Sequence, residues 1–143
     1  MLSNDTMRRV LQEHVDAENA HDRERVLATY VETGAIFDDV PAGRQYTGEG
    51  IIDNYRNLWD GFPGLVRHID RWTFGEDSCA IELTLSGTHD GLYRGIEPTG
   101  RKLELRIMAH FSFDADSRIT QETAYYDAQT FMRQLGLSRE TRS

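Results

Sequence analysis

The amino-acid sequence predicts an α+β fold, with most of its helices before about residue 63 and most of its strands after it. Apolar residues recur at helical spacing in the N-terminal part, whereas apolar and polar residues alternate over about residues 81–86 and 103–113. Such alternation is typical of half-buried antiparallel strands, which need a cover for their apolar face. We therefore expect a curved antiparallel sheet wrapped around three N-terminal helices, with an internal pocket between them and a short C-terminal helix.

The three N-terminal helices are predicted over about residues 4–20, 22–30 and 48–62. Ser3 or Asn4 can cap the first helix, and Asp22 caps the second, because a side-chain oxygen at this position accepts a free backbone N–H. Gly34 is expected to end the second helix. The third begins at Thr47 or Gly48 and carries a broad face rich in aromatic residues.

The predicted strands cover about residues 35–39, 65–74, 81–86, 103–113 and 119–126. The first of them turns through residues 40–43 into a weak hairpin arm that ends at Tyr46. Asp127 then caps the terminal helix, which stops at Gly136. With no linker or repeat in the chain, residues 1–143 are expected to form a single domain.

Composition excludes several classes of function. The net charge of −8 and the absence of a Lys/Arg-rich stripe disfavour nucleic acids and anionic membrane surfaces. No apolar run approaches the roughly 20 residues that cross a bilayer. The lone Cys79 fits a reducing, cytoplasmic setting. The five histidines lack zinc-site spacing and no nucleotide-binding glycine motif is present, so we expect neither a metal nor a cofactor.

Asp39 and His14 are the candidate catalytic residues. Asp39 ends a short apolar strand, where a carboxylate facing a cavity could move a proton at carbon; alternatively, it caps the turn that follows. His14 lies on the apolar stripe of the first helix and could act as an acid or as a donor to a developing oxyanion. Its alternative is a core histidine, satisfied by a backbone carbonyl or by Tyr30. In contact, His14 and Asp39 would set each other's protonation.

A second group of residues is expected to bind the substrate. Glu122 and Tyr126 share a strand face with Ala124, so both can line the pocket. The third helix supplies aromatic side chains that either stack on a flat ligand or fill the core. The full set of expected substrate-binding residues is Tyr30, Tyr55, Trp59, Phe62, Phe111, Glu122 and Tyr126.

Four stretches of the sequence carry a resemblance to a known family. Residues 85–101 and 131–136 resemble the SnoaL-like polyketide cyclases. Residues 18–22 and 35–41 resemble the wider NTF2-like superfamily, which includes ketosteroid isomerase. The resemblance implies the cone-shaped NTF2-like fold, which hosts cyclases, isomerases, dehydratases and proteins without catalytic activity.

The resemblance also assigns roles to individual positions. The general base of ketosteroid isomerase matches Asp39, and its oxyanion-hole tyrosine matches His14. Its second oxyanion-hole group matches Ala109. In the cyclases the catalytic aspartate matches Ala124 and its partner histidine matches Ala109, so both acid–base positions of the cyclases are alanine here.

Two functions follow as expectations. The first is a cofactor-free lyase or isomerase, cyclase-like, that acts by acid–base proton transfer on a small apolar oxygenated substrate in an internal cavity. The alternative is a non-catalytic NTF2-like module for ligand binding or dimerisation. We also expect a homodimer, because three helices cover one face of the sheet and leave the other, with Met108 among charges, for a partner.

Overall fold

A computed structural model describes residues 1–137. Four helices and a six-stranded sheet make up these residues, with the strands in the order β2-β1-β6-β5-β4-β3. The helices are α1 (Asn4–Asn19), α2 (Arg23–Ala28), α3 (Glu49–Gly61) and α4 (Ala128–Gln134). The strands are β1 (Ile36–Asp39), β2 (Arg44–Thr47), β3 (Val66–Gly75), β4 (Ser78–Thr88), β5 (Lys102–Phe113) and β6 (Ile119–Tyr126). The predicted elements and their order are therefore confirmed.

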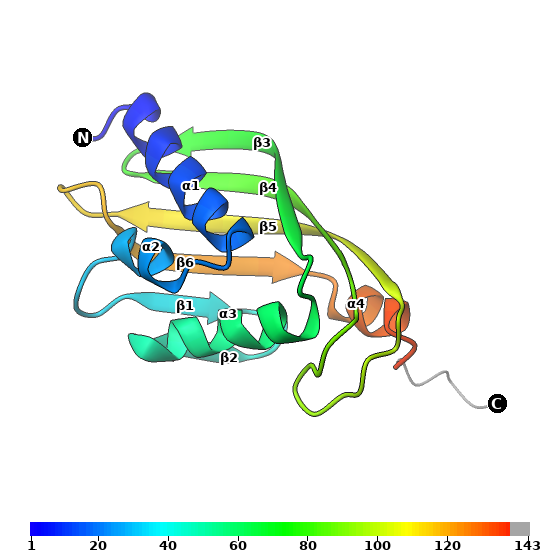
Figure 1. The fold of residues 1–143 in the computed structure, drawn as a ribbon. Coiled ribbons are helices and arrows are strands. Elements are labelled where there is room, and N and C mark those ends of the chain that lie inside the picture. The colour runs from blue at the N-terminus through cyan, green and yellow to red at the C-terminus, as the bar shows by residue number, and fades with distance from the viewer. Residues whose placement is uncertain (138–143) are drawn as a thin grey trace.

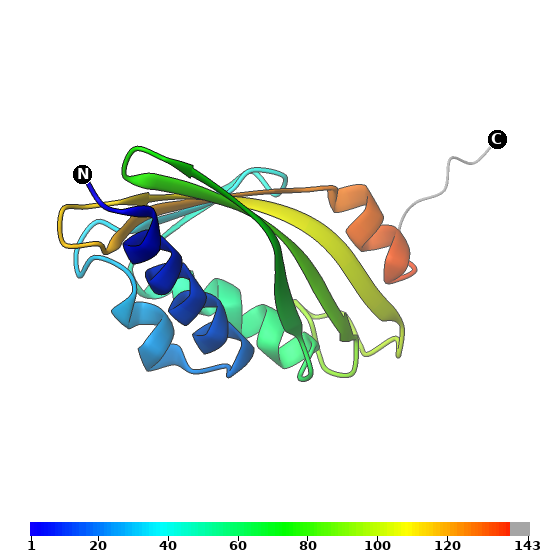
Figure 2. The same cartoon turned by 90° about the horizontal axis from the view of Figure 1, so that it is seen from above.

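The helices α1, α2 and α3 lie together on one face of the sheet, as Figure 1 shows. Seen from above, the sheet curves around them, and α4 lies beyond the far end of β6 (Figure 2). This arrangement confirms the predicted α+β fold with an open, curved sheet. One detail of the prediction is wrong: β1 runs parallel to β6, with Asp39 beside Ala124, so the sheet is mixed rather than antiparallel throughout.

The helix ends follow the predicted caps, with one exception. Ser3 Oγ accepts the backbone N–H of Thr6 at 3.1 Å, and Asp22 caps α2. However, α2 ends at Ala28 and not at Tyr30 or Gly34. The backbone of residues 29–31 bonds instead to Ile119. The Ile119 N–H donates to the Thr29 carbonyl oxygen at 2.8 Å, and the Val31 N–H donates to the Ile119 carbonyl oxygen at 2.9 Å. Pairing with β6 thus replaces the last helical turn.

The sheet presents its apolar residues to the helices in the predicted phase. On β5 the residues Leu103, Leu105, Ala109, Phe111 and Phe113 are buried, whereas the intervening Arg106, Met108 and His110 are exposed. Ala109 pairs directly with Ala124 on β6. Two short side chains at adjacent positions leave space between the sheet and the helices.

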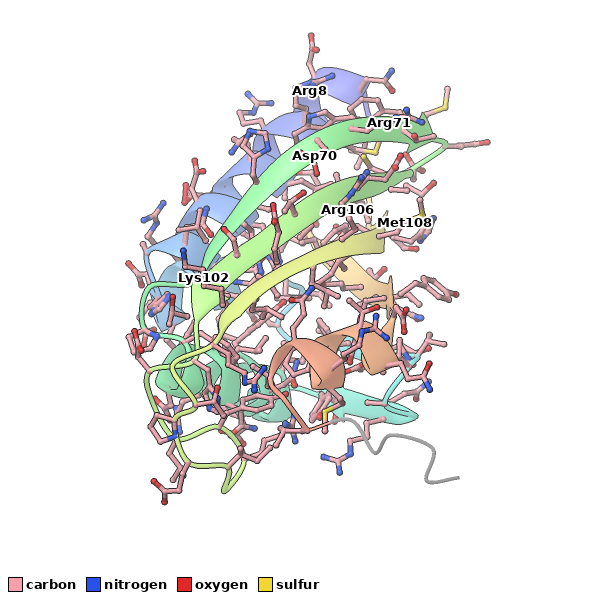
Figure 3. The ribbon with its side chains drawn as sticks, turned by 90° about the vertical axis from the view of Figure 1, so that its right-hand side faces the viewer. Arg8, Asp70, Arg71, Lys102, Arg106 and Met108 are labelled. Atoms are coloured by element: carbon pink, nitrogen blue, oxygen red, sulfur yellow. The ribbon has the colours of Figure 1, made fainter. Side chains whose placement is uncertain are left out.

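The opposite face of the sheet is polar and bonded within itself. A β-bulge at Asp70 lets two consecutive residues of β3 face outward. Asp70 accepts a hydrogen bond from Thr84 at 2.7 Å, and Glu82 lies between Arg71 and Arg106 at 3.4 and 3.8 Å. Figure 3 labels Asp70, Arg71, Arg106 and Met108 on this face.

The segment between β4 and β5 packs against the C-terminal end of α3 (Figure 1). The backbone N–H groups of Asp90 and Gly91 both donate to the carbonyl oxygen of Gly61, at 3.2 and 3.0 Å. This docking fixes Tyr93 and Arg94 next to the third helix. None of the helices formed by residues 1–137 has the length and apolar character needed to cross a membrane.

Candidate functional site

A cavity of about 80 Å³ lies between α3, the first strand and the concave face of the sheet. Most of its wall is apolar, including Phe37, Leu58, Ile81, Ile107 and the two alanines at 109 and 124. Polar side chains also reach it: Glu18, Asp39, Asn54, Tyr55, Arg67, Arg94, Glu122 and Tyr126. A space of this size holds several waters or part of a small organic molecule.

Asp39 is the carboxylate of the outer part of the cavity, and it is only 8% exposed. Its Oδ1 accepts a hydrogen bond from the Tyr126 hydroxyl at 2.8 Å and a longer one from the backbone N–H of Ala42 at 3.3 Å. Burial, with the bond to Asp39 next, raises the pKa of Tyr126, so this phenol stays a donor. Asp39 therefore caps the turn and faces the cavity at once. No residue from 1 to 137 donates a hydrogen bond to its Oδ2.

A wider hollow of about 270 Å³ opens next to this carboxylate. Asp39, Tyr93, Arg94, Tyr126 and Phe131 line both the hollow and the inner cavity. The outer hollow thus provides the route by which a molecule from solvent reaches Asp39.

Glu122 is the centre of a buried hydrogen-bond network behind the inner cavity. Its Oε1 accepts from the hydroxyls of Tyr30 at 2.7 Å and Tyr55 at 2.8 Å, and it lies 3.5 Å from His14 Nε2. Burial, followed by the charge of Glu122, raises the pKa of both tyrosines well above the ordinary value. Both phenols are therefore neutral donors, and Glu122 is the acceptor for both.

His14 is completely buried, with both ring nitrogens engaged. The Thr29 hydroxyl donates to the Val26 carbonyl at 2.6 Å, so its oxygen accepts from His14 Nδ1 at 2.8 Å. Nε2 lies 3.2 Å from Glu18. Burial alone would lower the pKa of His14, but the charge and hydrogen bonds of Glu18 and Glu122 outweigh it and raise the pKa to about 9. His14 is thus an imidazolium at neutral pH.

Arg67 completes this cluster from β3. Its Nε lies 3.3 Å from Glu18 Oε2, and its side chain forms part of the cavity wall. Although burial favours the neutral acid, Arg67 and then His14 lower the pKa of Glu18. Two cations, His14 and Arg67, therefore accompany two carboxylates, Glu18 and Glu122.

His14 and Asp39 do not form the pair that would have set each other's protonation. Among residues 1–137, His14 is bonded to Thr29 and the two glutamates, whereas Asp39 is bonded to Tyr126 and the turn. His14 is instead a buried core histidine, as in the alternative expectation. Its hydrogen-bond partners are side chains and not a backbone carbonyl. Its ring packs edge-on against Tyr30, with 5.4 Å between centroids.

The predicted substrate-binding residues divide into two groups. Tyr55, Phe111, Glu122 and Tyr126 lie on the cavity wall, as their strand and helix phases predicted. Tyr30, Trp59 and Phe62 do not line this cavity. Tyr30 lies behind Glu122, Trp59 stacks between Tyr55 and His21, and Phe62 packs against His89, Tyr93 and Phe131.

Four polar residues of the site were missed in the sequence: Glu18, Asn54, Arg67 and Arg94. Glu18 follows His14 by one helical turn on an apolar stripe, and Arg67 alternates with Leu65 and Ile69 in an inward phase. Because charged residues are rarely buried, a charged residue at a core-facing position of the repeat could have indicated a functional role for both. Asn54 and Arg94 carry no such signal, because a docked loop brings them together at 3.0 Å. Residues 1–137 contain no group of His, Cys, Asp and Glu side chains arranged to hold a metal ion.

The chain belongs to the SnoaL-like polyketide cyclase family, whose model matches residues 7–135. No curated protein matches the sequence significantly. Among solved structures, AclR from Streptomyces galilaeus, a proposed hydroxylase, has a TM-score of 0.84 at 17% identity, covering 98% of this chain and 91% of its own.

Two further structures are similar in the same way. A proposed SnoaL-like polyketide cyclase from Jannaschia sp. CCS1 has a TM-score of 0.83 at 18% identity, covering 97% of this chain and 99% of its own. IdmH from Streptomyces antibioticus, a proposed polyketide cyclase, has a TM-score of 0.79 at 21% identity, covering 91% of this chain and 98% of its own. At these identities the likeness establishes the fold alone.

Proposed function

We propose that this protein is a cofactor-independent lyase or isomerase that moves a proton on a small, mainly apolar, oxygenated molecule. The observation that carries the proposal is Asp39, a carboxylate on the wall of a mainly apolar cavity. One of its oxygens is held by Tyr126 and the turn, which leaves Oδ2 to accept a proton.

The reaction we propose begins at a carbon next to a carbonyl group. Asp39 Oδ2 takes the proton, the electrons of the C–H bond form a C=C bond, and the charge moves to the carbonyl oxygen. Returning the proton to a different carbon gives an isomerisation, and loss of a leaving group gives an elimination. Attack of the same enolate on a second carbonyl closes a ring, the type of reaction after which the family is named.

His14 supports this chemistry from behind the cavity wall. It is fully buried, and it reaches the cavity through the Tyr55 hydroxyl, 3.5 Å from Nε2. In place of direct donation to the substrate, we assign His14 the role of holding the Glu18 and Glu122 side chains in position and thereby orienting Tyr55. We expect Tyr55, Phe111, Glu122 and Tyr126 to contact the ligand.

Asp39→Asn tests the base. The amide keeps the size of the side chain and accepts from Tyr126, but it cannot take a proton. With 3-cyclohexen-1-one as the probe, conversion to the conjugated ketone is followed by the rise in ultraviolet absorbance. We expect Asp39→Asn to lower the rate by about 10²–10⁴-fold, the usual contribution of a positioned base.

The matched control is Asp38→Asn, the same change at the adjacent position of β1, which does not line the cavity. It should leave the rate unchanged. An Asp39→Asn protein that melts normally and retains the full rate would contradict the proposed role.

One observation favours a second candidate, a non-catalytic ligand-binding module. Ala109 and Ala124 are paired neighbours on the cavity wall, so the two positions matched to cyclase acid–base residues have no functional group. A wild-type protein that binds cyclic ketones but accelerates neither their isomerisation nor the exchange of their α-hydrogens in D₂O would support this candidate.

A further inference from the structure

The guanidinium of Arg67 is the one part of the buried charge cluster that the network does not account for. Arg67 is only 8% exposed, and its Nε is paired with Glu18 at 3.3 Å. Asn19, at the end of α1, fixes the backbone of Arg67 from both sides: its Oδ1 accepts from the Arg67 N–H at 2.7 Å, and its Nδ2 donates to the Arg67 carbonyl at 2.9 Å. The position of this side chain is therefore determined by two elements.

One terminal nitrogen of this guanidinium lacks an acceptor. Nη1 of Arg67 is buried and has no hydrogen-bond partner within residues 1–137. A buried donor without a partner is costly, and more so when it belongs to a charged group. Arg67 also lines the cavity, which brings its side chain close to a ligand bound there.

The other arginine of the wall is differently engaged. Nη2 of Arg94 donates to Asn54 Oδ1 at 3.0 Å and to the Tyr46 hydroxyl at 3.1 Å. Arg94 also lies where the cavity meets the outer hollow. Arg67 is thus the inner cation of the site, and Arg94 belongs to its entrance.

We propose that Arg67 binds the substrate oxygen on which negative charge develops, and that the substrate is a neutral ketone or enone rather than a preformed anion. This inference rests on the proposed function, with Asp39 as the base. Within residues 1–137 the charges of Glu18 and Glu122 are paired with His14 and Arg67, whereas Asp39 forms no ion pair and presents its charge to the cavity. A carboxylate substrate would meet that charge, whereas a neutral carbonyl compound would not.

Proton transfer then moves a single negative charge across the cavity. The C–H bond breaks, its electrons form the C=C bond, and the carbonyl π electrons pass to the oxygen at Arg67 Nη1. Asp39 becomes a neutral acid, and an enolate takes over its charge. The total charge of the cavity does not change, and the new anion is stabilised by a fixed cation in a site of low polarity.

The test uses 4-nitrophenol, whose anion places a negative oxygen on a flat ring as an enolate does. The host is Asp39→Asn, because its amide resembles the protonated base and removes the competing carboxylate. At a pH below the probe's own pKa, free probe is colourless and a bound phenolate is yellow. We expect the bound probe to be yellow and to bind more tightly to Asp39→Asn than to wild type.

Arg67→Lys in this host then identifies the cation. Lysine retains the charge opposite Glu18 but lacks the second donor nitrogen, so phenolate binding should weaken about ten- to a hundredfold, the loss expected for one hydrogen bond between charged groups. Arg71→Lys, on the outer face of the same strand, is the matched control and should leave binding unchanged.

Each contrary result overturns the inference. Binding that is as tight in the Arg67→Lys host as in its parent would do so, and so would a probe that binds only as the colourless phenol or does not bind. If Arg67→Lys fails to fold, the spectrum of the probe bound to Asp39→Asn decides. Because phenolate binding needs no turnover, a failure of ketone isomerisation with intact phenolate binding would refute the proposed function alone.

Discussion

Single residues set the electrostatics of this protein, and His14 is the clearest example. It lies between Glu18 and Glu122, with Tyr55 and Tyr30 also facing it and Arg67 beyond Glu18. Its pKa in the folded state, about 9, exceeds its ordinary value of 6.5. This raised pKa contributes stability that is complete below about pH 6.5 and is lost as the pH rises through 9. The loss is on the order of 3 kcal/mol, the free-energy equivalent of this difference in proton affinity.

Urea unfolding at a series of pH values tests this prediction. The free energy of unfolding of the wild type should fall between about pH 6.5 and 9.5. In His14→Gln, which does not titrate, that fall should be absent, although the variant is less stable at neutral pH because two buried glutamates lose their cation. A wild-type profile that is flat over this range would show that His14 is neutral in the folded protein.

The residues of the site differ in how far the sequence could reveal them. Strand phase was sufficient for Glu122 and Tyr126, because a period of two assigns every second side chain to the concave face. For Asp39 the sequence left two alternatives open, a cavity-facing carboxylate and a turn cap, and the structure shows both. Phase does not give distances across the core, so the association of His14 with Glu122 in place of Asp39 could not be foreseen. That contact depends on where α1 crosses the sheet.

At the scale of elements, the start of α4 depends on one side chain. Asp127 Oδ1 accepts the backbone N–H groups of Gln129 and Thr130 at 3.0 and 3.2 Å. Asp127→Ala removes this cap and should lower the melting temperature by several degrees. Asp127→Asn should change it little, since Asn caps about as well. Circular dichroism melts measure both, and a large loss of isomerase activity in a normally melting Asp127→Asn would place the catalytic carboxylate here instead.

The loop between β4 and β5 depends on Gly91. A Cβ atom at this position would lie 1.9 Å from the carbonyl oxygen of Asp60, so Gly91→Ala must displace the loop from α3. We expect a loss of stability on the order of 2 kcal/mol and faster amide hydrogen exchange over residues 89–96. Gly64→Ala is the control, because its Cβ would meet nothing within 4 Å. Unchanged exchange in Gly91→Ala would mean that the loop is not anchored at Gly61.

Helices and strands were predictable where caps and periodicity within the segment determine them. They were less predictable where hydrogen bonds to a distant segment determine their ends or their partners. Caps and periodicity located α1, α3, α4 and the long strands. The second helix was predicted too long, because the bonds from residues 29–31 to Ile119 are tertiary. The parallel pairing of β1 with β6 was missed for the same reason, since nothing within a four-residue strand specifies its partner.

At the scale of the whole molecule, we propose that two copies pair through the outer face of the sheet. Met108 and Tyr125, cross-strand neighbours on β5 and β6, are 43% and 50% exposed. The charged residues Asp70, Arg71 and Arg106 belong to the same face (Figure 3), and Glu82 pairs there with Arg71 and Arg106. A small apolar centre with a polar rim is the usual anatomy of a moderate interface.

Sedimentation velocity at micromolar concentration measures this association. The wild type should sediment as a dimer, and the double variant Met108→Glu/Tyr125→Glu as a monomer. Leu92→Glu introduces the same charge at a 53% exposed residue of the β4–β5 loop and should remain dimeric. A monomeric wild type would refute the proposal.

The parallel contact between β1 and β6 also governs the order in which the protein can form. A β1–β2 hairpin of two four-residue strands is not stable alone, and its other neighbour in the sheet is made more than 80 residues later. On the ribosome, Asp39 therefore has to wait for Tyr126 to be synthesised. A nascent chain that ends before β6 already contains Asp39, but it lacks the Tyr126 hydroxyl that holds this proposed base and the glutamate, Glu122, beside His14.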